Sequence, residues 1–539
     1  MIGKMCRIMF ILLVVVCLIQ IFSARDAFCF DRFFVGSRAL GMAGANVASV
    51  NDNSAQYYNP ATFGFFGMRN REGVPDKDKK KEEKKKEAAK NKKEKKTKEK
   101  NPMQVKTQAN TKLYVDNNNL GARDFSVGAY AGIGYRLHEN MGKLLDDLSS
   151  IDTLELSTDT MEDANDVKNV MKLAEVLNKI DSPGNAITVN GSTGGSVGMG
   201  HFAIGGYGFL QANARVVSVD TTNLGISGST DPTDFRDDIN AVTMPSGYDS
   251  AIALFSDAQR DQLLAAGLDL EAVQRLDYMA RQEGVSPTDL QGTVDILDTI
   301  VQQAGGSGGD LEDNTTSASL EGFGLIEVPI SYGKALNENL SLGGSLKLMQ
   351  GYVYGTEVVI FNKESGDILD DADKNYKEST TFGVDLGAMY RIKRLNFGIV
   401  ARNINSPEFD GPTVAGRKFA DVTLDPSVTA GVAFIPYEGF TLEADYDITK
   451  QETVFPGYDS QYFSVGAEWL LLRFLALRVG AYKNTAESDI GLVYTAGIGL
   501  NFFNLHFDLA GAYSSDEGTF DGNDYPLESY VQLKLSFGF

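Results

Sequence analysis

Hydrophobic and polar residues alternate along the chain from about residue 315 to the C-terminus. In residues 440–448, FTLEADYDI, every second residue is apolar and the residues between are Thr, Glu or Asp. Residues 490–502, IGLVYTAGIGLNF, repeat this pattern with mostly Gly, Thr and Asn on the second face. Such alternation is typical of a strand with one apolar and one polar face. It predicts a sheet that contacts lipid on one side and water or a plug on the other.

The length of these strands favours a membrane barrel over a large soluble β-sandwich, whose strands also alternate. They run to roughly 10–13 residues, the length that a tilted strand needs to cross a bilayer, whereas strands of soluble sheets usually have about five or six. A sandwich would also bury Glu443, Asp445 and Asp447 in a dry core, which is costly for charged groups.

We expect about fourteen strands, an even number as in single-chain outer-membrane barrels. They cover residues 124–137, 184–199, 202–219, 317–333, 338–356, 378–392, 394–403, 426–436, 438–450, 460–470, 472–484, 490–503, 504–514 and 527–539. Short and long connections alternate between them, which is the arrangement of periplasmic turns and outer loops. The predicted fold is therefore an all-β, antiparallel transmembrane barrel over residues 104–539.

Two of the long outer loops, about 138–183 and 220–316, carry helical patterns. Ser256 with Gln259 resembles a capping box, Gly284 ends a helix, and Ser286–Pro287 is expected to begin the next one. Two apolar stripes lie at helical spacing: Leu270, Val273, Leu276, Met279 and Val294, Leu297, Ile300, Val301. Either these helices pack on one another above the barrel, or they form a hydrophobic vestibule that captures an apolar ligand.

The two chain ends carry signals for export and insertion. Residues 1–29 have the basic start and the apolar run of a signal peptide, although a membrane anchor is the alternative. The terminal strand ends on Phe537 and Phe539, which resembles the signal that the barrel-assembly machinery recognises; simple packing is the other interpretation of Phe539. Aromatic residues near strand ends would suit interfacial girdles: Tyr352, Tyr354, Tyr390, Trp469, Tyr482, Phe502 and Tyr513.

A run of lysines separates the N-terminal segment from the barrel. The chain has 50 Lys and Arg against 72 Asp and Glu, a net charge of −22, yet residues 71–103 are rich in Lys and Glu. Such a run is a solvated, disordered linker by default, and a tether to an anionic polymer is the alternative. Nucleic acid is an improbable partner because no aromatic residues interleave with the lysines. Residues 104–116 could add one more strand.

Few residues are available for catalysis or metal binding. The only cysteines are Cys6, Cys17 and Cys29, and the chain has 3 histidines that are far apart in sequence. We therefore expect no enzyme activity, no cofactor and no metal site. Charged residues of both signs are expected to form a polar network in the lumen: Glu443, Asp445, Asp447, Arg391, Arg402 and Arg478.

Residues 36–61, GSRALGMAGANVASVNDNSAQYYNPA, are too rich in small residues for a helix and too irregular for a strand. This segment resembles the N-terminal signature of the FadL-type superfamily of outer-membrane proteins. The matching positions are Asp52, Ser54, Ala55, Asn59, Pro60 and Ala61. With helical excursions in its first two outer loops, the chain is most similar to the TraF-like branch, known as plasmid conjugal-transfer proteins.

The resemblance implies that residues 30–70 fold inside the barrel as a hatch. It also implies that outer loops catch an apolar small molecule, and that an inward kink in the third strand opens an exit; Gly205, Gly206 and Gly208 could permit that kink. The expected function is passive uptake of a hydrophobic compound by a monomer in the outer-membrane lipid. A conjugal-transfer or secretion component without transport is the alternative, and a plug disfavours a general diffusion pore.

Overall fold

The computed structural model describes residues 31–66, 125–150, 164–182, 184–221, 223, 232–304, 313–359, 374–453, 455, 457–471, 474–502, 504–520 and 523–538. Within them, fourteen antiparallel strands follow one another around a closed barrel, in which the last strand pairs with the first. They are β1 (Ser126–His138), β2 (Ala186–Met199), β3 (Phe202–Ser218), β4 (Ser317–Ala335), β5 (Leu340–Val359), β6 (Tyr376–Ile392), β7 (Leu395–Arg402), β12 (Ser427–Tyr437), β13 (Phe440–Asp447), β16 (Tyr462–Leu471), β17 (Leu475–Asn484), β18 (Val493–Phe502), β19 (Leu505–Ser514) and β22 (Glu528–Gly538). The predicted fold class and strand count are confirmed.

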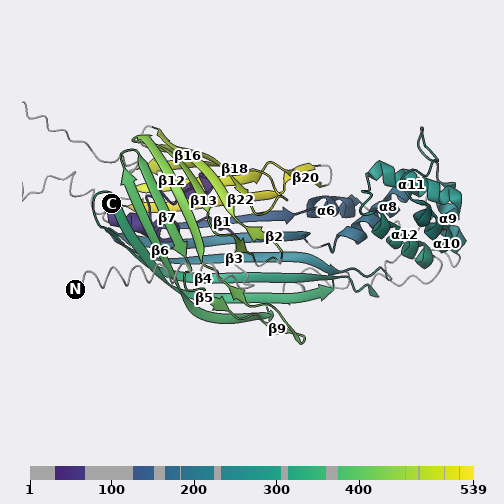
Figure 1. Ribbon diagram of the computed structural model, residues 1–539, viewed down its shortest axis with the longest axis horizontal. Coiled ribbons are helices and arrows are strands. Elements are labelled where there is room, and N and C mark those ends of the chain that lie inside the picture. The colour runs from purple at the N-terminus through teal and green to yellow at the C-terminus, as the bar shows by residue number, and fades with distance from the viewer. Residues whose placement is uncertain are drawn as a thin grey trace, which may run out of the picture.

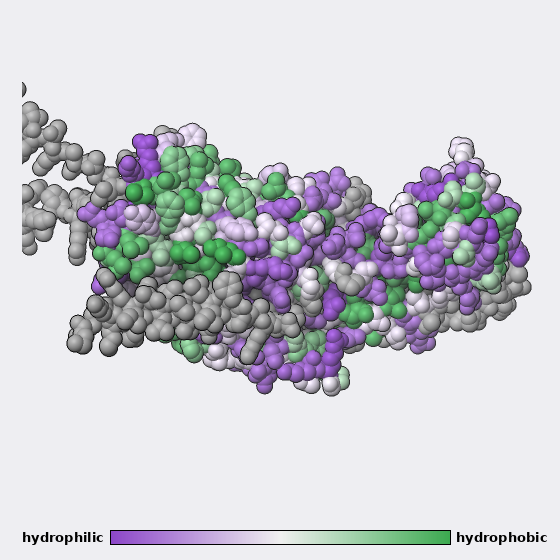
Figure 2. All heavy atoms as spheres, in the orientation of Figure 1, coloured by the Kyte–Doolittle hydropathy of each residue, from purple (hydrophilic) through white to green (hydrophobic). Residues whose placement is uncertain are grey.

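Alternation places each strand's apolar residues on the outside of the barrel. In β13, Leu442 and Tyr446 are 40% and 42% exposed, whereas Glu443 and Asp445 between them are 2% and 4% exposed. Figure 2 shows hydrophobic residues gathered over the half of the barrel farther from the helices. The barrel thus has an apolar outer belt and a polar interior.

The long connections lie at one end of the barrel, together with the helices (Figure 1). The first loop carries α6 (Met141–Ser150) and α8 (Ala164–Lys179). The second carries α9 (Pro232–Ala241), α10 (Asp257–Ala266), α11 (Leu270–Glu283) and α12 (Leu290–Ala304). None of the helices in the described ranges has the length and hydropathy needed to cross a bilayer. Short hairpins extend other loops: β8 (Glu408–Phe409) with β11 (Val422–Thr423), β9 (Thr413–Val414) with β10 (Arg417–Lys418), β14 (Gln451–Glu452) with β15 (Asp459–Ser460), and β20 (Glu517–Phe520) with β21 (Asn523–Pro526).

The helices of α8 to α12 form a small module with its own apolar core. Both predicted stripes are buried in that core except at Leu270, which is 52% exposed. The stripes therefore pack on one another and on α8, and they do not line a vestibule. The capping box of Ser256 and Gln259 is present, and Gly284 ends α11 in the left-handed conformation. The expected start at Ser286–Pro287 is wrong, because these residues precede the helix and α12 begins at Leu290.

Residues 31–66, called the hatch below, fold inside the barrel. Their elements include α2 (Ser37–Gly41), α3 (Ala55–Tyr58) and the 3-10 turn η1 (Pro60–Thr62), and residues 63–66 are also helical. Most hatch residues are buried, and the segment lies within the strands in Figure 1. The signal peptide (1–29), the linker (71–103), the possible strand at 104–116 and Phe539 lie outside the described residues, so these remain predictions.

Candidate functional site: the hatch and the lumen around it

The predicted NPA turn anchors the end of the hatch to the barrel wall. The side-chain oxygen of Asn59 accepts a hydrogen bond from the backbone N–H of Ala61 (3.1 Å), which caps η1. The amide nitrogen of Asn59 donates to the carbonyl of Val47 (3.0 Å) within the hatch and to that of Ala388 (3.1 Å) in β6. Pro60 occupies the first position of η1, where a missing N–H costs nothing. Asn59 therefore ties two hatch segments to one strand.

A second anchor lies where the first and last strands meet. Asp52 accepts a hydrogen bond from the backbone N–H of Ser54 (2.9 Å) and forms an ion pair with Lys534 of β22. Asn53 donates to the carbonyls of Ser126 (3.2 Å) in β1 and Ser196 (3.3 Å) in β2. Asp52, which the resemblance singled out, and Asn53, which it did not, thus hold the hatch to three neighbouring strands.

Two lumen carboxylates bind the hatch backbone directly. Glu443 accepts hydrogen bonds from the N–H groups of Ala48 (2.6 Å) and Ser49 (3.2 Å). Asp445 accepts from those of Asn46 (2.8 Å) and Val47 (2.9 Å). An irregular segment leaves its N–H groups without regular partners, and buried carboxylates satisfy them here.

The other predicted lumen residues also face inward but have separate partners. Arg478 pairs with Glu468 (2.7 Å) and Asp508 (2.6 Å), and Glu468 in turn binds Arg38 of the hatch (3.1 Å). The guanidinium of Arg402 lies 4.8 Å from the ring centre of Tyr57. That of Arg391 lies 4.3 Å from the ring centre of Phe65. Asp447 accepts hydrogen bonds from two wall groups, the hydroxyl of Thr429 (2.7 Å) and the backbone N–H of Tyr462 (3.0 Å).

Glycines of the wall make room for the hatch backbone. A Cβ atom added at Gly333 would lie 2.5 Å from the nitrogen of Gly64 and 2.6 Å from the oxygen of Pro60. The same close approach to hatch backbone, under 3 Å, recurs on other strands around the lumen, at Gly343, Gly398, Gly466 and Gly480. At Gly387 the group that approaches is the side chain of Asn59. Inward glycines therefore follow the path of the hatch from strand to strand. Their sequence pattern shows which face they occupy, but not what approaches it.

The three predicted kink glycines lie at a local break between two strands. β3 pairs with β2 along its length, but its pairing with β4 runs from Ile204–Ile330 to Tyr207–Glu327 without the two pairs between. The residues opposite that break are Val328 and Pro329, and proline has no N–H for a ladder. A Cβ atom at Gly205 would lie 2.8 Å from the side chain of Gln56. Gly205 thus also accommodates the hatch, and Gly206 and Gly208 face away from it.

A cavity of about 110 Å³ lies beside the hatch in the lumen. Its apolar or aromatic lining comes from Phe33, Tyr57, Tyr58, Phe209, Leu325 and Leu424. Its charged lining comes from Arg32, Glu327, Lys347, Arg402, Asp445 and Asp447. The cavity could hold a small molecule with an apolar face.

A second lumen pocket and an outer groove lie on opposite sides of the same wall. The pocket, about 50 Å³, lies beside Asp52 and Asn53. The groove, about 530 Å³, is lined by apolar residues of the outer face, such as Ile204, Leu505 and Leu535. Both share Val127, Gly128, Ser196, Ser536 and Phe537. Phe537, predicted as an insertion signal, therefore lines both the lumen pocket and the outer groove.

Some lumen residues were not predicted from the sequence. Tyr482 was expected in an interfacial girdle, but it is 2% exposed and its ring centre lies 5.6 Å from that of Phe34. It shares its parity in β17 with the inward Arg478, so parity could have placed it correctly. Arg32 and Phe33 carry no local signal of their position, because the hatch has no regular periodicity.

Residues 109–447 of the chain match the family described as "F plasmid transfer operon, TraF, protein". Among solved structures, a TodX mutant monoaromatic hydrocarbon channel shares 10% identity and a TM-score of 0.41, covering 95% of this chain and 100% of that one. The Pseudomonas putida toluene transporter TodX shares 11% identity with a TM-score of 0.40, covering 94% and 98%. A Pseudomonas aeruginosa FadL homologue shares 10% with a TM-score of 0.38, covering 95% and 100%. No curated protein matches the chain. The structural likenesses are too weak to carry an activity over.

Proposed function

Because the chain belongs to the family of the F plasmid transfer operon TraF protein, we propose that it is an outer-membrane barrel, and that it passes a hydrophobic compound through its hatch-filled lumen. The apolar outer belt fits a bilayer, and the signal peptide expected at residues 1–29 fits export. Transport is passive, since the proposed site needs neither a cofactor nor a catalytic group.

The cavity beside the hatch is the observation that carries this proposal. Its apolar lining joins hatch residues Phe33 and Tyr57 to wall residues Phe209 and Leu325. An apolar molecule bound there replaces water on an aromatic surface, which is favourable. Because part of the surface belongs to the hatch, binding acts on the segment that closes the lumen.

The wall near Asn53 provides the exit in this proposal. The lumen pocket and the outer groove share Gly128 and Ser196, two residues with little or no side chain. The break between β3 and β4 at Gly205–Gly206 lies on the next strand. An apolar compound leaving here enters the lipid layer and does not cross the polar turns below.

A reversible lock on the hatch tests the proposal. Asn53 and Ser126 are joined by a hydrogen bond of 2.7 Å, so Asn53→Cys with Ser126→Cys, in a Cys29→Ser background, can form a disulfide between hatch and wall. Uptake of a labelled fatty acid and a labelled aromatic hydrocarbon into proteoliposomes is measured before and after reduction. We expect oxidation to reduce uptake at least about tenfold and reduction to restore it.

A second disulfide serves as the matched control. The hydroxyls of Ser331 and Ser345 lie 2.7 Å apart on neighbouring strands of the lumen wall, so Ser331→Cys with Ser345→Cys joins strand to strand and leaves the hatch untethered. Both substitutions remove a hydrogen bond to Gln56 of the hatch, but this loss is the same before and after reduction. Uptake should survive this oxidation. Equal uptake by the locked and reduced hatch, or no uptake of either compound by the parent barrel, would contradict the proposal. Deleting residues 36–61 should make the barrel leaky.

A second candidate function is a conjugal-transfer component that transports no small molecule. The family description and the extent of the match, which includes the helical module, favour it. Removing the gene from donor cells should then abolish DNA transfer, while uptake of hydrophobic compounds by those cells stays unchanged.

A further inference from the structure

The hairpin between β13 and β16 reaches across the outer mouth of the barrel. Its described residues are 448–453, 455 and 457–461, which include β14 and β15. Its Phe455 and Tyr458 pack with Ala186, the first residue of β2. Going the shorter way round, β17, β18, β19 and β22 separate β16 from β1. The two aromatic side chains therefore bridge from one wall to another far around the barrel.

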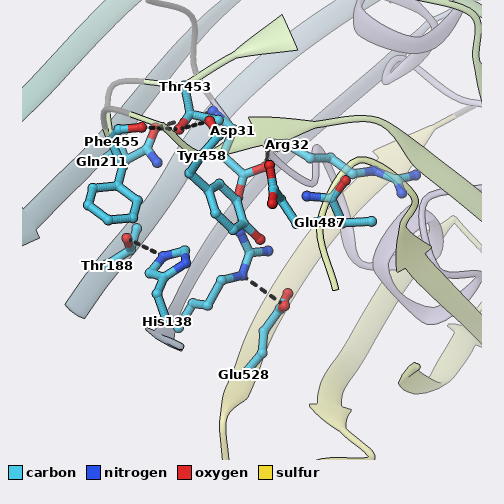
Figure 3. Close-up of polar contacts among 12 residues, drawn as sticks. Asp31, Arg32, His138, Thr188, Gln211, Thr453, Phe455, Tyr458, Glu487 and Glu528 are labelled. Carbon is cyan, nitrogen blue, oxygen red and sulfur yellow. Dashed lines mark hydrogen bonds and ion pairs between the residues drawn. The ribbon is translucent and has the colours of Figure 1, made fainter. Parts of the chain in front are cut away.

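His138, the last residue of β1, is where the hairpin ends on the far wall. Its ring centre lies 5.0 Å from that of Phe455 and 4.4 Å from that of Tyr458. Its Nε2 lies 2.8 Å from the hydroxyl of Thr188 in β2. Figure 3 shows Phe455, Tyr458 and Thr188 gathered around the imidazole. His138 is 1% exposed, so the hairpin covers it almost completely.

A second outer loop reinforces this contact. Asp489, between β17 and β18, lies 3.3 Å from Nδ1 of His138. Glu487 of the same loop accepts a hydrogen bond from the backbone N–H of Asp459 in the hairpin (3.0 Å). The loop at 485–492 therefore joins the hairpin to His138 from a third side.

The underside of the hairpin contacts the lumen cavity and the start of the hatch. Gln451 and Ser460 line the cavity beside the hatch. The guanidinium of Arg136 lies 5.6 Å from the ring centre of Tyr458, and Arg136 forms ion pairs with Asp31 of the hatch and with Glu528 (2.9 Å). Closure of the mouth is thus linked through Arg136 to the first described residue of the hatch.

We propose that residues 448–461 form a lid over the outer mouth of the lumen, latched on the far wall at His138. The lid regulates entry to the same cavity, so this inference rests on the proposed function. The charged and titratable groups that face the latch are Arg136 and Glu528 from the wall, Asp31 from the hatch, Asp489 and Glu487 from the second loop, and Tyr458 from the lid. The latch has no covalent bond, so thermal opening admits molecules from outside.

The lid is tested by how easily a lumen cysteine is labelled from outside. Ser427 lines the cavity. In whole cells, the labelling rate of Ser427→Cys in a Cys29→Ser background therefore reports how easily a membrane-impermeant maleimide reaches the cavity from outside. Phe455→Ala and Tyr458→Ala are each added to this reporter. We expect each to accelerate labelling by about tenfold or more, because truncating a buried aromatic side chain removes most of its packing.

Tyr248→Ala is the matched control, since Tyr248 packs on Tyr278 in the helical module (5.2 Å between ring centres) and not on the lid. Its labelling rate should equal that of the parent reporter. Heat-modifiable mobility in gels shows that each variant is folded, and His138→Ala provides an independent opening of the latch. Unchanged labelling in folded Phe455→Ala, Tyr458→Ala and His138→Ala variants overturns the lid, as does equal acceleration in Tyr248→Ala. The readout needs no transport, so failure of the uptake proposal would leave this result intact.

Discussion

At several inward positions of the wall, the contacting backbone of the hatch explains which residue type is present. At inward positions such as Gly333 the hatch lies so close that no side chain fits. At inward positions such as Glu443 the hatch instead presents N–H groups that need an acceptor. The choice between Gly and a carboxylate on the same face follows from what the hatch presents there.

Replacing one contact glycine should loosen the hatch. In Gly333→Ala the new methyl group would lie 2.5 Å from backbone of the hatch, and overpacking of this kind costs about 1–3 kcal/mol. We expect trypsin to cleave at Arg38, which is 4% exposed in the closed hatch, roughly five- to a hundredfold faster. Gly324→Ala in the same strand is the control, because its nearest neighbour would lie at 3.7 Å. Equal cleavage in both variants would show that the hatch tolerates the methyl group.

Alternation along a strand indicates which side chains face the lumen. Nearness to a strand end did not reliably indicate which aromatic residues lie in an interfacial girdle. Glu443, Asp445 and Arg478 each alternate with apolar neighbours, and all three are buried. Tyr482 was placed wrongly because it was judged by its nearness to the strand end. No local pattern specified the partner of a residue such as Asp52, because Lys534 lies at the other end of the sequence.

At the scale of whole elements, the sequence predicted where the strands lie. It did not predict which part of the barrel each loop contacts. Alternation and turn residues are local signals, so the predicted and observed strands differ by a few residues at their ends. The hairpin at 448–461 has no local signal for the wall it contacts. Its position depends on contacts such as those of Phe455 with His138, which lie more than 300 residues apart in sequence.

The closed lid should lose stability at both lower and higher pH, because two carboxyl groups with oppositely shifted pKa values contribute to it. Burial alone would raise the pKa of Asp489, but the hydrogen bond and charge of His138 lower it below its ordinary value of 3.8. Its contribution to the closed lid is therefore present above about 3.8 and is lost as pH falls through the lowered value. Burial and the negative charge of Glu452, which lies in β14 of the lid, raise the pKa of Asp425, just before β12, to about 6. The contribution of Asp425 to the closed lid is present below pH 3.8 and is lost as the pH rises through about 6.

Labelling of the Ser427→Cys reporter should therefore be slowest near about pH 4, and should accelerate as the pH falls further or rises through about 6, after correction for thiolate reactivity. Asp489→Asn should remove the acid limb and Asp425→Asn the alkaline limb. A free cysteine peptide supplies the correction for thiol ionisation. A corrected rate that does not vary between pH 3 and 8 would exclude both carboxyl groups from lid control.

Across the whole molecule, the helical module and the barrel have separate apolar cores. The core of the module consists of residues from α8 to α12 and their connecting segments, with no residue from a barrel strand. The barrel is held by its ladders and by the hatch contacts. The two parts should therefore be separable at the loops that join them.

Removing residues 232–304 alone should damage α8 but not the barrel. Val167 and Met171 of α8 are fully buried against that segment, so its loss exposes their apolar surface. We expect protease cleavage within 164–182 and an unchanged heat-modifiable barrel band. Removing 151–182 as well should abolish the cleavage. Loss of the barrel band in the double deletion would mean that the module is needed for insertion.

The hatch has one consequence for biogenesis. It precedes every described strand in the sequence, but its anchors are distributed from Ser126 in β1 to Lys534 in β22. Asp52 and Lys534 are separated by 482 positions, and contacts this distant form slowly because the intervening chain must be ordered first. The segment that is translated earliest should thus acquire its structure last, after β22 has met β1. Until then its apolar side chains lack their native partners, and such transiently exposed apolar surface is prone to aggregate and is a natural substrate for chaperones.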